Sequence, residues 1–107
     1  MQKLLLGVIL LRIYKGDNGV VLRFTILDDG IEVDLTGATI EGVIQTKTKR
    51  IIKPANIIDA VAGKVDIILN SDHLTEVGRH NIQIIVTFPG GNKYSSDIKS
   101  FYVSSTL

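Results

Sequence analysis

The sequence contains no cysteine and no tryptophan, and only two of its 107 residues are proline. Without cysteine, disulfide bonds, zinc–thiolate sites and thiol catalysis are excluded. Aromatic residues make up 6% of the chain, so there is little material for the aromatic platforms that bind sugars. The 12 Lys and Arg residues nearly balance the 11 Asp and Glu residues. The basic excess of a nucleic-acid-binding domain is therefore missing, and we expect neither nucleic acid nor a membrane as a partner.

The longest apolar run, residues 4–11, is far shorter than the roughly 20 residues needed to cross a bilayer. No small-residue cleavage site follows it, so we interpret it as a first β-strand, at about residues 3–14, and not as a targeting segment. Both of its alternating faces are aliphatic. A sandwich strand usually keeps one face in water, so its second face must be covered by its own chain or by another protein. We favour another protein, and the candidate interface residues are Leu4, Leu5, Leu6, Ile9, Leu10 and Leu11.

Isoleucine and valine are abundant: 16 Ile and 10 Val, or 26 of 107 residues. Such β-branched side chains favour strands. They fall into short runs separated by turn signals every 8–12 residues, a pattern typical of a sandwich or barrel. The length allows one domain, residues 1–107. One short helical turn, at about residues 71–77, is predicted as a crossover between two sheets.

Two local patterns predict particular backbone features. Asp29-Gly30 predicts a tight hairpin, because both residues tolerate positive φ. In the last strand, at about residues 93–104, Tyr94 and Ile98 share one parity whereas Phe101 and Val103 share the other. A strand with period two cannot bury both pairs, so we predict a bulge or kink near residues 99–100.

No pattern in the sequence points to catalysis or to a metal. His73 and His80 lie seven residues apart without ligands at suitable spacing, and we expect one to be exposed and one packed. The carboxylates of the first half lack the spacing of a calcium loop, and we interpret them mainly as turn formers; they are Asp17, Asp28, Asp29, Glu32 and Asp34. The chain is predicted not to be an enzyme and to use no cofactor, metal or small-molecule ligand.

One basic cluster stands beside a predicted hairpin tip, where charges keep a sheet edge soluble. Its members are Lys47, Lys49, Arg50 and Lys53.

Three stretches together resemble one known family. They are residues 15–24 (KGDNGVVLRF), residues 33–40 (VDLTGATI), and residues 63–88, from Gly63-Lys64-Val65 through the crossover to the Ile82–Phe88 strand. Their order and spacing resemble the N-terminal domain of phage baseplate upper proteins, from tailed phages and prophages of Gram-positive bacteria. One departure is His80, since an aromatic residue, usually Tyr, is expected two residues after the crossover glycine.

The resemblance implies an all-β, immunoglobulin-like antiparallel β-sandwich of about seven to nine strands. It also implies an N-terminal anchoring domain of a longer protein, which docks to the baseplate core and carries host-recognition parts. The implied partners are other baseplate and tail proteins and further copies of the chain, in a homo-oligomer. The implied location is the virion tail, after assembly in the bacterial host cytoplasm.

A second interpretation remains open, a β-sandwich module that binds carbohydrate or a cell surface. It predicts an exposed aromatic platform built from Tyr14, Tyr94 or Tyr102.

Overall fold

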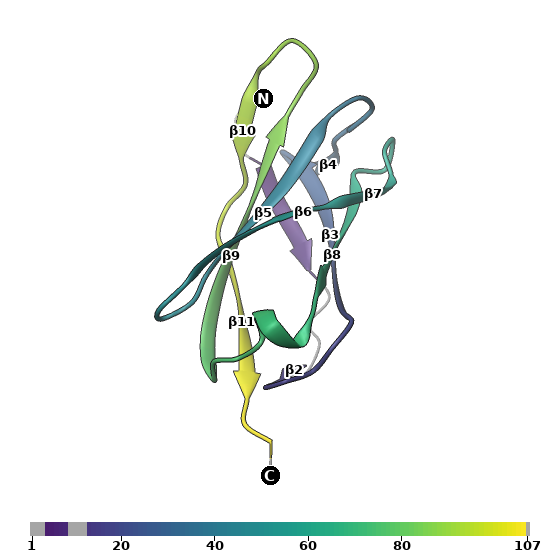
Figure 1. Cartoon of the computed structure of the whole chain (residues 1–107). Helices are drawn as coiled ribbons and strands as arrows, with labels where there is room; N and C mark the ends of the chain where they lie inside the picture. The colour runs from purple at the N-terminus through teal and green to yellow at the C-terminus, as the bar shows by residue number, and fades with distance from the viewer. Residues whose placement is uncertain (1–3, 9–12, 107) are drawn as a thin grey trace.

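In a computed structural model, which describes residues 13–106 and the backbone of residues 4–8, two β-sheets face each other (Figure 1). The five-stranded sheet runs in the order β1 (Leu4–Val8), β3 (Val20–Asp28), β8 (Lys64–Leu69) and β7 (Asn56–Asp59), with β4 (Ile31–Glu32) also beside β3. The six-stranded sheet runs in the order β2 (Ile13–Tyr14), β11 (Lys99–Ser104), β9 (Gly78–Thr87), β5 (Thr39–Gln45) and β6 (Arg50–Pro54), with β10 (Lys93–Ser95) also beside β9.

The order of the strands is that of an immunoglobulin-like domain. With β1 and β2 taken as two parts of strand A, one layer reads A-B-E-D and the other A-G-F-C-C′. The predicted fold class is thereby confirmed. The described residues contain eleven strands, more than the seven to nine expected. Two of them, β2 and β4, are only two residues long, and the last expected strand is divided into β10 and β11.

The first expected strand, at residues 3–14, does not run through a single sheet. Strand β1 pairs antiparallel with β3 in one sheet, whereas β2 pairs parallel with β11 in the other. The prediction of one continuous strand was therefore wrong. Ile13 is 1% exposed and lies in the core, so the chain changes sheets to place this side chain between the two layers.

The core lies between the sheets and follows the alternation expected of half-buried strands. Every second residue of β3, β5, β8 and β9 is buried, whereas most of the residues between them are exposed or half-buried. The core residues on these four strands are Leu22, Phe24, Ile26, Ile40, Ile44, Val65, Ile67, Leu69, Ile82, Ile84 and Val86. The two layers are therefore held together by aliphatic side chains from strands far apart in the sequence.

The irregularity expected in the last strand is present between β10 and β11. Ser95 pairs with Ile85 and Lys99 pairs with Ile82. The three residues between them on one side, 96–98, therefore oppose only two residues of β9, 83 and 84. This one-residue excess is a β-bulge at residues 96–98, just before the expected position. It lets Phe101 become buried while Ile98 is 62% exposed.

Of the other local predictions, the hairpin is confirmed and the helical turn is shorter than expected. Asp29 and Gly30 have φ of 52° and 78° between β3 and β4. The helical turn spans only Ser71–His73 and has Asn70 as its N-cap. The imidazole Nδ1 of His73 accepts a hydrogen bond of 2.9 Å from the backbone N–H of Asn70, which closes the turn.

Gly63, in the turn between β7 and β8, lies against the backbone of β3 and of the segment after β4. Its φ is +70°, and a Cβ there would lie 2.8 Å from the Ile26 carbonyl oxygen and 2.9 Å from that of Val33. Its own carbonyl accepts a hydrogen bond of 2.8 Å from Ile26 N–H. Any side chain would displace this backbone.

We expect Gly63→Ala to lower the free energy of unfolding by about 2–4 kcal/mol, because positive φ and a backbone clash act together. Gly16→Ala is the matched control: its φ is +85°, but nothing lies within 4 Å of the added Cβ. That change should cost only about 1–2 kcal/mol. Urea denaturation of both variants measures the difference, and equal losses would contradict the role of close packing at Gly63.

Candidate functional site

The predicted interface residues lie partly within the described structure. Leu4, Leu5 and Leu6 belong to β1, where they pair with Asp28, Leu27 and Ile26 of β3. Ile9, Leu10 and Leu11 lie outside the described residues. Strand β1 is the end strand of the five-stranded sheet, so only one of its edges pairs with a strand among the described residues.

The long edge strands differ in how they are protected against pairing with another chain. Strand β6 carries Arg50, Lys53 and Pro54, and charges and proline both discourage strand addition. Strand β7 has a register shift between Ile57 and Asp59, and such a bulge twists an edge away from partners. Strand β1, with the sequence LLLGV, has no charge, no proline and an unbroken register. Within the described residues, β1 is the edge best suited to accept another strand.

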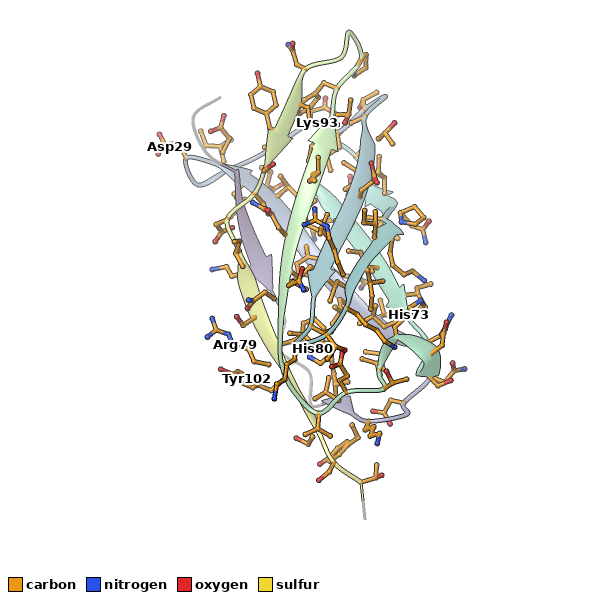
Figure 2. The ribbon with its side chains drawn as sticks, turned by 60° about the vertical axis from the view of Figure 1, so that its left-hand side comes forward. Asp29, His73, Arg79, His80, Lys93 and Tyr102 are labelled. Carbon is orange, nitrogen blue, oxygen red and sulfur yellow. The ribbon has the colours of Figure 1, made fainter. Side chains whose placement is uncertain are left out.

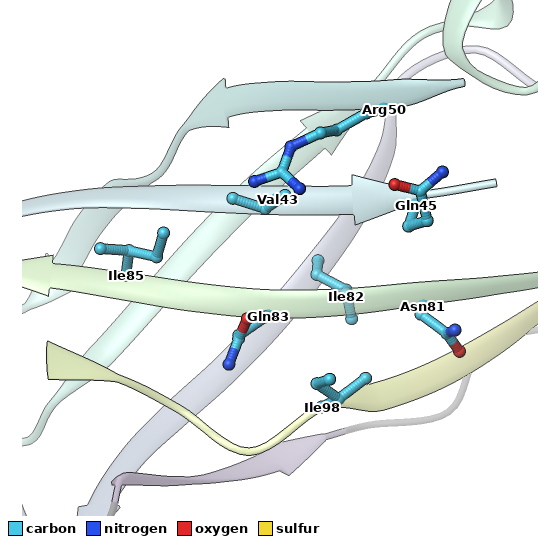
Figure 3. A pocket seen from close by; sticks show the side chains of 8 residues that line it. All are labelled: Val43, Gln45, Arg50, Asn81, Ile82, Gln83, Ile85 and Ile98. Atoms are coloured by element: carbon cyan, nitrogen blue, oxygen red, sulfur yellow. The ribbon is translucent and has the colours of Figure 1, made fainter.

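A shallow hollow of about 250 Å³ lies on the outer face of the six-stranded sheet (Figure 3). Ligand pockets are generally larger and more enclosed. The hollow is lined by Val43, Gln45, Arg50, Asn81, Ile82, Gln83, Ile85 and Ile98. It combines aliphatic and amide side chains with a single charged group, the guanidinium of Arg50.

The bulge between β10 and β11 borders this hollow and is held by hydrogen bonds. The hydroxyl of Ser96, itself buried, accepts a hydrogen bond of 2.9 Å from Ile84 N–H and donates one of 2.8 Å to the Asp97 carbonyl. Gln83 Nε2 donates one of 2.8 Å to the Ser96 carbonyl. Bulges of this kind re-aim a side chain, and here the result is that Ile98 points away from the core.

The two histidines lie on different elements, His73 on the short helical turn and His80 on β9 (Figure 2). His73 closes the turn and keeps 17% of its side chain exposed. His80 is 1% exposed, its ring lies 5.1 Å from that of Phe101, and its Nδ1 lies 3.1 Å from the Gly78 carbonyl oxygen. Among the described residues no group of three or more His, Cys, Asp and Glu side chains is placed to hold a metal ion.

Two of the carboxylates in the first half form turns, as expected. Asp17 Oδ2 accepts a hydrogen bond of 2.9 Å from Tyr14 N–H. Asp34 Oδ1 accepts bonds from the hydroxyl and the N–H of Thr36, at 2.6 and 3.0 Å. Both bonds lower the pKa of Asp34, and the bond from the Thr36 hydroxyl has the larger effect.

The tyrosines of the second interpretation do not form one platform. Tyr14 and Tyr102 lie on the neighbouring strands β2 and β11, and Tyr102 is 64% exposed. Tyr94 lies on β10 and packs edge-on against Phe88, with ring centroids 5.8 Å apart. Only Tyr102 has the exposure that stacking on a sugar requires.

The basic hairpin tip between β5 and β6 is anchored to the crossover before β9. The Glu76 carboxylate accepts hydrogen bonds from the hydroxyls of Thr46 and Thr48, the latter at 2.7 Å. Lys49 Nζ donates one of 3.1 Å to the Thr75 hydroxyl. These two hydroxyl hydrogen bonds lower the pKa of Glu76, and the bond from Thr46 has the larger effect.

No helix among the described residues is long and apolar enough to span a membrane.

The sequence matches the family described as BppU N-terminal domain over residues 3–106. No curated protein matches it. Among solved structures, the N-terminal domain of phage TP901-1 ORF48 aligns with a TM-score of 0.73 and 16% identity, over 89% of this chain and 84% of that chain. At this identity the likeness concerns the fold. The structure of murine CRIg aligns with a TM-score of 0.48 and 10% identity, over 97% of this chain and 98% of that chain.

We expect the stability of the wild type to fall, relative to Glu76→Gln, as the pH drops below the ordinary carboxyl pKa of 4.5. The folded state has the lower pKa, so its extra stability is present above the unfolded value and disappears as the pH falls through the folded value. Urea denaturation between pH 3 and 7 measures this. Glu32→Gln, the same change at an exposed position on β4, is the control. A constant difference between wild type and Glu76→Gln across this range would contradict the prediction.

Proposed function

Because the chain belongs to the BppU N-terminal domain family, and is thus a structural domain of a phage baseplate, we propose that it docks onto the baseplate core. In this proposal it carries the host-recognition parts of a longer protein outward. It acts by binding other tail proteins and not by catalysis. It joins the tail during assembly in the cytoplasm of the bacterial host.

The unprotected edge of β1 is the observation that supports docking through the N-terminal segment. An added strand would form main-chain hydrogen bonds with the free edge of residues 4–8. The other two long edge strands, β6 and β7, carry features that oppose this pairing. A partner strand would thus join the five-stranded sheet next to β1.

The composition of the N-terminal segment supports the same surface. Residues 4–11 read LLLGVILL, with no charged side chain. Burial of apolar surface supplies about 25 cal/mol for each Å² removed from water. We propose that Leu4, Leu5, Leu6, Ile9, Leu10 and Leu11 contribute to the interface with the baseplate core.

We expect the double variant Leu5→Glu with Ile9→Glu to stay folded and to fail to enter the baseplate, because two charges would be buried at the interface. The measurement is complementation of a phage that lacks this protein, with electron microscopy of the tails and an infectivity count. Circular dichroism and thermal unfolding of the 107-residue domain report whether the fold is intact.

A matched control is Val21→Glu with Ile68→Glu, two aliphatic residues that pair across β3 and β8 and are 36% and 41% exposed. This variant should assemble normally. Normal assembly of the Leu5 and Ile9 variant would refute docking through this segment. Unfolding of the Leu5 and Ile9 variant would instead show that the N-terminal segment belongs to the core of the domain.

A further inference from the structure

Tyr102 and Arg79 lie side by side on the outer face of the six-stranded sheet. Tyr102 of β11 pairs directly with Arg79 of β9, and both side chains point outward on the same side of the sheet (Figure 2). Side chains that face each other across two strands have Cβ atoms about 4.5–5.5 Å apart. Tyr102 is 64% exposed, and it stacks on no other ring among the described residues. A flat aromatic surface therefore lies open next to a guanidinium.

The guanidinium of Arg79 is held in place by two neighbouring polar side chains. Its Nε donates hydrogen bonds to Asn81 Oδ1, at 3.2 Å, and to Ser100 Oγ, at 3.1 Å. The Ser100 hydroxyl donates a bond of 2.8 Å to the same oxygen of Asn81. The three bonds close a triangle across β9 and β11. The long side chain of Arg79 is thereby restrained before any ligand binds, which lowers the entropy that binding costs.

The polar groups that this triangle leaves free are mainly donors. Arg79 donates only through Nε, so the N–H groups of its terminal nitrogens are available. The Asn81 oxygen accepts two bonds, and its amide N–H groups are also available. Arg79 forms no ion pair within the part of the chain that the structure describes. Such a fork of donors with an uncompensated positive charge binds a carboxylate or phosphate through two parallel hydrogen bonds.

The shallow hollow on the same face continues this group of donors along the sheet. Asn81 belongs to both, because it lines the hollow and also accepts the bonds of the triangle (Figure 3). Gln45 and Gln83 donate through Nε2 to backbone carbonyls, so their Oε1 atoms face the hollow as acceptors. Arg50 supplies further donors. Hydroxyl groups use both donors and acceptors, so the hollow suits a ligand rich in hydroxyl groups.

We propose that this surface, the Arg79 site (Arg79, Asn81, Ser100 and Tyr102, with the hollow beside them), binds an anionic saccharide. The C–H groups on one face of a sugar ring pack against the ring of Tyr102. Arg79 and Asn81 hold the carboxylate or phosphate of that sugar, and the hydroxyl groups of the next sugar enter the hollow. An acidic peptide segment fits less well, because the site offers no deep apolar pocket to anchor a side chain.

The proposal goes beyond docking and does not depend on it. The Arg79 site lies on the six-stranded sheet, whereas docking is proposed for β1 at the edge of the five-stranded sheet. The two surfaces can therefore be occupied and tested separately.

The test is a titration of the isotope-labelled 107-residue chain, followed by two-dimensional NMR. The probes are trigalacturonate, which carries carboxylates, and glucose 6-phosphate. We expect binding at millimolar concentration that shifts the amide signals of Arg79, Asn81 and Tyr102. Binding of trigalacturonate alone identifies the anion as a carboxylate, and binding of glucose 6-phosphate alone identifies it as a phosphate.

Two further compounds are the matched controls for the ligand. The methyl ester of trigalacturonate has the same rings without the charge, and pentaglutamate has the charge without a sugar ring. Both should leave the signals of the Arg79 site in place.

Variants of the protein separate the two contacts. Arg79→Gln should weaken binding about tenfold, because a charge-assisted hydrogen-bond pair is lost. Tyr102→Ala should weaken it about fivefold, whereas Tyr102→Phe keeps the stacking surface and should bind within about twofold of the wild type. Lys64→Gln removes an exposed charge from β8 on the other sheet and should have no effect.

A wild type that binds neither probe at millimolar concentration would overturn the proposal. So would equal binding of the methyl ester, or of either probe by the Arg79→Gln variant. Equal binding of pentaglutamate would show that the site takes an acidic peptide and would overturn the assignment to a saccharide. The Leu5→Glu and Ile9→Glu variant should bind the probes like the wild type, so failure of docking and failure of this proposal give different results.

Discussion

Aliphatic side chains packed between the two sheets hold this domain together. Gly42 of β5 lies against Ile67 of β8, and a Cβ at Gly42 would collide with that side chain. The layers can therefore approach closely at this point. Because each strand commits one face to this core, its other face must meet water or another protein. The outward-facing residues therefore decide whether each sheet face is solvated or binds another protein.

The outer faces of the two sheets differ in whether their charged side chains form ion pairs. On the five-stranded sheet, Arg23 and Asp66 form a bidentate ion pair across β3 and β8, with distances of 2.8 and 2.9 Å. Hydrogen bonding from Arg23 lowers the pKa of Asp66. The charges there satisfy each other. On the six-stranded sheet, neither Glu41 nor Arg50 forms an ion pair among the described residues.

The bulge at residues 96–98 connects core and surface. Ser96 is buried and hydrogen-bonded to β9, while Ile98, two residues on, is largely exposed. One inserted residue thus serves both layers: it returns Phe101 and Val103 to the core and places an aliphatic side chain outside. The edges show a comparable division, because β6 and β7 carry protective features and β1 does not. Together these features describe a small domain built to join an assembly.

Much of this could be predicted from local patterns. The alternation of Val65, Ile67 and Leu69 predicts an inward face because strand periodicity is a local property. The parity conflict between Tyr94 and Phe101 predicts the bulge for the same reason. The family resemblance, which needs several motifs in order, led to the immunoglobulin-like fold that the strand order confirms.

Other features depend on which strands become neighbours. The passage of the chain from β1 in one sheet to β2 in the other follows from where Ile13 packs, and no local pattern marks it. The alignment of Ile52, Val43 and Gln83 likewise requires the register of three strands. The buried side of β3, β5, β8 and β9 follows from the alternation of their residues, because a period of two is a local property of each strand. Which outward side chains lie together could not be predicted in this way, because it depends on pairing between residues far apart in the chain.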